Sequence, residues 1–152
     1  MADFDPTALL SRPIDDFKQL PPMPTGGYVC TVAKREFGQS KEKKTPYVEF
    51  TLLPTETLPD VDQEKLAEAL GESNLMAKEQ KLTFYLTPDA LWRLKEFGRD
   101  HVGVSEEEAT TTAELIEACL NKQVVINMEH KPNQKNPERP FANIASTAAV
   151  PG

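Results

Sequence analysis

A short polar loop separates two segments in which apolar and polar residues alternate, YVCTVAKREF at 28–37 and PYVEFTLLP at 46–54. A period of two is typical of β-strands, because successive side chains point to opposite faces of a sheet. Two such segments joined by so short a loop predict an antiparallel hairpin, in which Pro46 begins the second strand and Pro54 ends it. The residues predicted to face the core are Tyr28, Cys30, Val32, Val48, Phe50 and Leu52.

The rest of the chain predicts three more strands and two helices. The strands are KEQKLTFYL, QVVINMEH and FANIASTAAV. The first helix is TPDALWRLKEFGRDHVG, with Thr87 as N-cap and Gly103 as its end, and the second covers 110–120. This order matches the OB-fold, a five-stranded, partly open barrel that binds oligonucleotides. We therefore predict a mainly β fold with helices, an OB-fold-like five-stranded barrel with a helical insert between strands 3 and 4. Other small barrels or an α+β meander would give the same pattern.

The chain of 152 residues predicts one domain preceded by an arm. Residues 1–26 contain five prolines and few regular apolar repeats, which is typical of an extended segment. Residues 27–150 are predicted to form a single OB-like domain. Within it, 54–76 is an acidic insert that contains a helix, capped by Asp60 or Asp62.

The acidic residues of this insert do not predict a metal site. Asp60, Asp62 and Glu64 have the spacing of a calcium loop, but that loop needs a glycine at its sixth position and a glutamate at its twelfth. Those positions hold Lys65 and Gly71, and Gly71 is better explained as the end of the helix.

The net charge of −7 is unevenly distributed along the chain. Residues 54–80 have seven acids and two bases, and residues 104–121 have five acids and no base. By contrast, 28–53 has five bases and three acids, and 122–152 has four bases and two acids. The predicted strands are therefore mildly basic, and an acidic total does not exclude a polyanionic partner, since binding responds to the local field.

Signatures of enzymes, cofactors and membrane spans are absent from the sequence. The two histidines, His101 and His130, have no triad or metal-ligand spacing, and there is no phosphate-binding loop. Cys30 and Cys119 are predicted to be buried free thiols, with a disulfide as the minor alternative. The N-terminal MADFDPTALL has acids where a secretory signal needs bases, and no apolar run reaches about 18 residues. We expect a non-enzymatic cytoplasmic protein without a cofactor.

What remains is binding, for which the loops supply lysines and the strands supply aromatic residues. Single-strand binders combine a basic groove with aromatic side chains, because every base has a π-face and every nucleotide a phosphate. Strand alternation places Tyr47 outward beside the lysine loop, and the last hairpin loop is also basic. The same alternation predicts that Arg35, Phe37, Lys81 and Tyr85 also point outward, away from the core-facing residues of their strands. The predicted nucleic-acid-binding residues are Arg35, Phe37, Lys41, Lys43, Lys44, Tyr47, Lys81, Tyr85, Lys131, Lys135, Arg139 and Phe141.

The alternative for each aromatic residue is ordinary packing, because most aromatic side chains in strands belong to a core. Lysine-rich hairpin tips also occur simply because they keep edge strands soluble. Trp92, on the first predicted helix, is expected to be a packed anchor and not a platform for a base.

Three segments, GGYVCTV, SKEKKTPYVEFTLLP and FYLTPDALWRLKEFG, resemble a group of small, mostly uncharacterised proteins encoded by tailed phages and prophages. The resemblance covers roughly residues 10–130 as a pattern. It implies an accessory protein of replication or recombination, similar to phage single-stranded DNA-binding proteins with an OB-fold. Many of those end in an acidic tail that recruits partners, whereas this sequence ends STAAVPG. The two acidic blocks are then candidates for recruitment or self-inhibition.

The leading functional prediction is a sequence-tolerant single-stranded DNA-binding protein of phage type, which supports DNA replication or recombination and acts in the bacterial host cytoplasm. RNA is an alternative ligand, since discrimination depends on contacts to the 2′-hydroxyl. One alternative function is a phage protein-interaction module that inhibits a host enzyme, imitating DNA through its acidic blocks. Another is a virion or assembly component.

Overall fold

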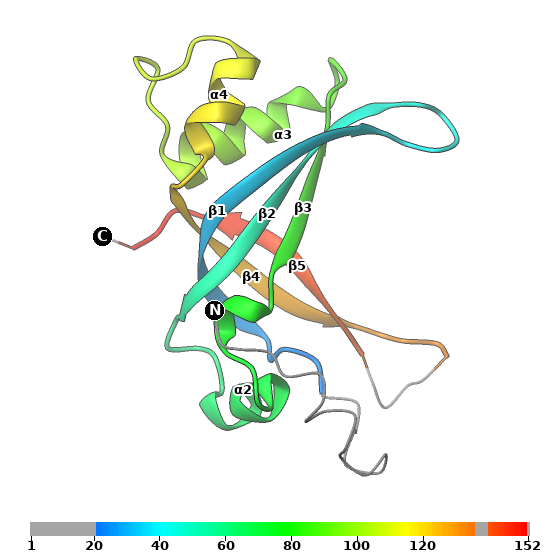
Figure 1. The fold of residues 1–152 in the computed structure, drawn as a ribbon, viewed down its shortest axis with the longest axis vertical. Coiled ribbons are helices and arrows are strands. Elements are labelled where there is room, and N and C mark those ends of the chain that lie inside the picture. Colours follow the sequence, from blue (N-terminus) through cyan, green and yellow to red (C-terminus); the bar gives the residue numbers. More distant parts are fainter. Residues whose placement is uncertain (1–20, 136–139, 152) are drawn as a thin grey trace, which may run out of the picture.

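A computed structural model describes residues 21–135 and 140–151, which form a five-stranded antiparallel sheet with helices, a mainly β member of the α+β class (Figure 1). The strands are β1 (Gly26–Gln39), β2 (Pro46–Thr57), β3 (Gln80–Tyr85), β4 (Gln123–Lys131) and β5 (Phe141–Ala148). Their order in the sheet is β3-β2-β1-β4-β5. The predicted hairpin is β1–β2, and all five predicted strands are confirmed.

The helices lie at the two ends of the strands. Helix α2 (Gln63–Leu70) and the short 3-10 helix η2 (Leu75–Ala77) follow β2, and α2 lies at the lower end in Figure 1. Between β3 and β4 come α3 (Leu91–Glu96), the π-helical turn η3 (Phe97–Val102) and α4 (Thr112–Cys119), at the upper end. The predicted helical insert between strands 3 and 4 is therefore confirmed. Among the described residues, no helix has the length and apolar character needed to cross a bilayer.

Helix α2 forms where its capping residues predict. The Asp62 side chain accepts from the backbone N–H groups of Glu64 and Lys65, and Gly71 ends the helix at φ 57°. Asp60 has a different role, because its Oδ1 accepts from the backbone N–H of Gly27 at 3.0 Å. This bond fixes the acidic insert against the start of β1.

The core lies between one face of the sheet and these helices. Phe97 of η3 packs against Phe50 and Phe84, with ring centroids 5.4 and 5.0 Å apart. The predicted inward residues of β1 and β2 are all buried. Tyr28 donates its hydroxyl to the carbonyl of Pro24 at 2.7 Å, which fixes the segment that enters β1. The first twenty residues of the predicted arm lie outside the described part of the chain.

The sheet is not closed into a barrel. In the order β3-β2-β1-β4-β5, the strands β3 and β5 are the two edges. The prediction of a five-stranded, mainly β fold is confirmed, whereas closure of the barrel is not.

Two predicted boundaries were wrong. Pro54 does not end β2, which continues to Thr57, because a register shift near Cys30 and Pro54 accommodates the missing N–H. Thr87 does not cap the first helix: its carbonyl accepts from Ala90 and Leu91 in a separate turn, and α3 begins at Leu91 without a side-chain cap. Gly103 ends this helical segment as predicted, at φ 90°.

Candidate nucleic-acid interface

The lysine loop between β1 and β2 has a defined backbone. The N–H of Ser40 donates to the carbonyl of Thr45 at 2.9 Å, and Ser40 Oγ accepts from the N–H of Thr45 at 2.9 Å. Lys44 adopts a left-handed φ of 54°, which turns the chain back toward β2. The closed turn leaves all four tip residues exposed: Lys41, Glu42, Lys43 and Lys44.

Tyr47 and Tyr85 are cross-strand neighbours on β2 and β3. Their rings meet edge to face, with centroids 6.3 Å apart. Tyr85 is 49% exposed, whereas Tyr47 is half-buried. The Tyr47 ring lies over Gly38: a Cβ added to Gly38 would be only 2.5 Å from the hydroxyl oxygen of Tyr47. Tyr85 is therefore the more accessible ring of the pair.

A hollow joins the lysine loop to Tyr85. It has a volume of about 510 Å³ and is bordered by Lys41 and Lys43 on one side and by Tyr85 on the other. Glu42 and Asp89 also border it and oppose the lysine charges. Cationic and aromatic side chains from two separate segments thus meet around one concavity.

Lys81 lies on the same outer face as this tyrosine pair, as the alternation predicted. Its Nζ donates to Thr51 Oγ1 at 2.7 Å and lies 3.7 Å from a carboxylate oxygen of Glu79. The side chain is therefore partly engaged by its neighbours.

Arg35 and Phe37 do not lie on the predicted face. The β1–β2 register shifts between Val32 and Lys34, so that Ala33 is an extra residue in β1. A bulge of one residue reverses the alternation after it. As a result, Arg35 and Phe37 emerge on the face that carries the core, opposite to the tyrosine pair.

Arg35 has a structural partner on that face. Its guanidinium donates to the Glu117 carboxylate of α4 through Nε at 3.1 Å and through Nη2 at 2.5 Å. The same hydrogen bonds lower the pKa of Glu117. Phe37 is 53% exposed, with the Arg35 guanidinium carbon 5.1 Å from its ring centroid. These two residues thus form a separate cluster, which Arg35 joins to α4.

The last hairpin carries a second basic and aromatic cluster. Lys131 and Phe141 are cross-strand neighbours on β4 and β5, and Phe141 is 55% exposed. Lys131 Nζ lies 3.6 Å from Glu129, and the backbone N–H of Lys135 donates to Asn133. Arg139 lies outside the described residues. The hollow beside Tyr85 does not include this hairpin, although both hairpins extend to the right in Figure 1.

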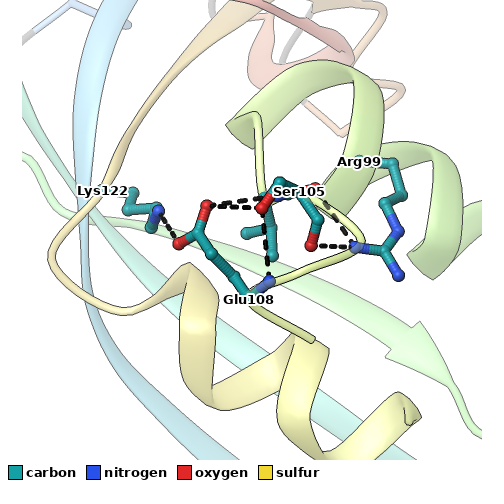
Figure 2. Close-up of polar contacts among 5 residues, drawn as sticks. Arg99, Ser105, Glu108 and Lys122 are labelled. Atoms are coloured by element: carbon teal, nitrogen blue, oxygen red, sulfur yellow. Dashed lines mark hydrogen bonds and ion pairs between the residues drawn. The ribbon is translucent and has the colours of Figure 1, made fainter. Parts of the chain in front are cut away.

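Most carboxylates of the acidic block 104–121 have structural contacts. Glu108 accepts from Lys122 Nζ at 2.5 Å and from Ser105, and these bonds lower its pKa (Figure 2). Arg99 donates to the backbone carbonyls of the same loop, including Ser105 (Figure 2). Glu114 completes the capping box of α4 with Thr111, and Glu117 is held by Arg35. Of the five acids, three thus fix this loop and α4.

The histidines and cysteines have packing roles in the described structure. His101 Nδ1 lies 2.5 Å from Thr147 Oγ1, and His130 Nε2 lies 2.7 Å from the carbonyl oxygen of Met23. Cys30 and Cys119 are buried free thiols, and burial raises their pKa values to about 12 and about 11. Within 21–135 and 140–151, no group of His, Cys, Asp or Glu has metal-binding geometry.

The exposure of Trp92 also differs from the sequence-based prediction. It was expected to be a packed anchor, but it is 56% exposed and borders hollows on both sides of α3. Leu94 and Phe97 face the core, and a helix turns about 100° per residue, which places Trp92 roughly opposite Leu94. The position of Trp92, two residues before Leu94 on the helix, was the signal that could have identified its exposure.

Comparison with protein-family models and with curated proteins finds no match for this chain.

Proposed function

We propose that this chain is a non-enzymatic, sequence-tolerant single-stranded DNA-binding protein of phage type, which supports replication or recombination. The observation that carries the proposal is the hollow between the lysine loop and Tyr85, where cations and an exposed ring converge. Phosphates would lie along Lys41 and Lys43 while a base stacks on Tyr85, the combination on which single-strand binding depends.

The topology supports the same class. Pairing of β3 with β5 would close the order β3-β2-β1-β4-β5 into a five-stranded barrel, so the fold is proposed to be an open form of the OB-fold. In OB-folds the face of strands 2 and 3 and the loops between strands 1 and 2 and strands 4 and 5 bind oligonucleotides. In this chain the tyrosine pair lies on β2 and β3, and the two basic hairpin loops connect β1 with β2 and β4 with β5, which supports the proposal. The alternative of a DNA-mimicking inhibitor is less favoured, because Glu108, Glu114 and Glu117 are engaged in internal contacts.

The test is fluorescence anisotropy with labelled oligo-dT, oligo-dA, oligo-rU and a matched duplex. We expect similar affinities for the two DNA single strands and weaker binding of the duplex; the oligo-rU arm decides between DNA and RNA. Affinity should fall with salt, with a slope of about −0.7 per phosphate contacted. Absence of binding to all four probes at low salt would refute the proposal.

Two charge-matched variants locate the interface. K41Q/K43Q should weaken binding and reduce the slope of log affinity against log salt by about 1.4, because two phosphate contacts are lost. K65Q/K78Q makes the same change in net charge outside the hollow and should leave the slope unchanged. D89N removes a carboxylate from the hollow and should strengthen binding. Equal effects of the two lysine variants would contradict this interface.

A further inference from the structure

The open side of the sheet forms a groove. Between the edges β3 and β5 lies a hollow of about 610 Å³, bordered by 82–85 of β3, by α3 and η3, and by 144–147 of β5. Phe84 and Phe97, whose ring planes are tilted by 43° to each other, form part of its lining. His101 of η3 contacts Thr147 of β5, so the helical segment spans the gap between the two edges.

This groove is adjacent to the hollow beside the lysine loop. Tyr85 and Ala90 border both concavities. A strand whose phosphates lie on Lys41 and Lys43 and whose base stacks on Tyr85 therefore has a path into the gap between β3 and β5.

The groove has aromatic side chains in its lining and little net charge. Trp92 stands at its border, 56% exposed, with the Arg93 guanidinium carbon 5.4 Å from its ring centroid. Arg93 and Glu96, both in the lining, balance each other. A near-neutral, partly aromatic lining suits bases, whereas the lysine loop suits phosphates.

We propose that the groove between β3 and β5 is a second part of the single-strand site, in which Trp92 stacks on a base. This inference rests on the proposed function and extends it, because it predicts that longer oligonucleotides bind both concavities. A single strand is favoured over a peptide as the occupant, since the groove adjoins the hollow that the lysines border.

Trp92 is the one tryptophan of the chain, so tryptophan emission reports on the surroundings of this side chain. The experiment titrates the protein with oligo-dT of about 4 and about 16 nucleotides, the range of site sizes per OB-fold. We expect strong quenching by the longer oligonucleotide and weak quenching by the shorter one, with anisotropy following binding in parallel.

Variants separate stacking from a general loss of apolar surface. W92A should weaken binding of the longer oligonucleotide about 5- to 100-fold and leave the shorter one unchanged. W92F should recover part of the loss because it keeps a ring. M76A removes another exposed apolar side chain, on η2 and outside the groove, and should have no effect.

The outcomes are distinct. Binding of the longer oligonucleotide without a change in Trp92 emission, and with unchanged affinity of W92A, would overturn the inference while the proposed function stands. If the groove binds a protein segment and not a base, the oligonucleotide should likewise leave the Trp92 emission and the affinity of W92A unchanged. Absence of binding by anisotropy would refute the proposed function, and this inference with it. Thermal unfolding of each variant verifies that the fold is retained.

Discussion

At the scale of single residues, Tyr47 and Tyr85 are neighbours with different surroundings. Tyr47 packs over Gly38 and supports the ring of its neighbour, whereas Tyr85 projects into the hollow beside the lysine loop. Strand alternation predicted that both point outward, which the structure confirms. Alternation could not predict which of the two rings is more exposed, because the burial of Tyr47 depends on its packing over Gly38, which has no side chain.

The two tyrosines should therefore respond differently to truncation. Y85A should weaken binding of oligo-dT about 5- to 100-fold, the loss expected for one stacked base. Its free energy of unfolding should fall by less than about 1 kcal/mol, since the ring is largely exposed. Y47A should also weaken binding, but with a loss of about 2 kcal/mol in stability because it removes a half-buried ring. Anisotropy and urea denaturation measure the two quantities.

A Y85A protein that binds as tightly as the unchanged chain would exclude Tyr85 from the interface. Y85F serves as the control, because it keeps the ring and should keep most of the affinity.

At the scale of elements, the contact between η3 and α4 depends on a glycine. Gly98 is buried, and an added Cβ would lie 2.6 Å from Leu115 Cδ1 and 2.7 Å from its Cγ. The two helical segments can approach this closely because position 98 has no side chain. This approach helps to hold η3 beside the groove.

G98A should therefore lower the free energy of unfolding by about 1–3 kcal/mol, the usual cost of overpacking. L115A creates the space that the new methyl group needs, so the double variant should lose less than the sum of the two single variants. G103A is the matched control: it has a strained φ of 90° but no atom within 4 Å, and its effect should add to that of L115A. Additive effects of G98A and L115A in urea denaturation would contradict the close contact.

The elements also show where prediction from sequence succeeds. Alternation around Val48 and Phe50 identified the strands, because this signal is local. Gly71 identified the end of α2 for the same reason, whereas the cap was left open between Asp60 and Asp62 and the structure selects Asp62. The side on which Arg35 and Phe37 emerge could not be predicted, since the bulge at Ala33 depends on pairing with β2. The hollow beside Tyr85 joins residues from two loops, and no local pattern encodes such a contact.

At the scale of the whole molecule, three buried acidic groups make the fold sensitive to alkali. Burial is the main cause that raises the pKa of Cys30 to about 12 from 9.0, that of Cys119 to about 11 from 9.0, and that of Tyr28 to about 12 from 10.0. Each group stays protonated in the folded chain at a pH where it ionises in the unfolded chain. The folded state then binds more protons, so the free energy of unfolding falls as the pH rises.

We expect this contribution to be fully present below pH 9 and to be lost between about pH 9 and about pH 12. Denaturation by urea at about pH 8 and about pH 10 measures it. C30A removes one of the groups and should reduce the fall in stability between the two pH values. An equal fall in the variant and the unchanged chain would show that Cys30 does not contribute.

The open edge of the sheet also affects how the molecule can deform. In a closed barrel, strand number and shear together fix the radius. Here β3 and β5 are edges, and no ladder of backbone hydrogen bonds joins them. Side chains and the η3 segment therefore set the distance between these two strands. The curvature of the sheet can therefore change without breaking its internal pairing. Such elasticity would let one groove accept purines and pyrimidines alike, which would give the proposed binding its tolerance of sequence.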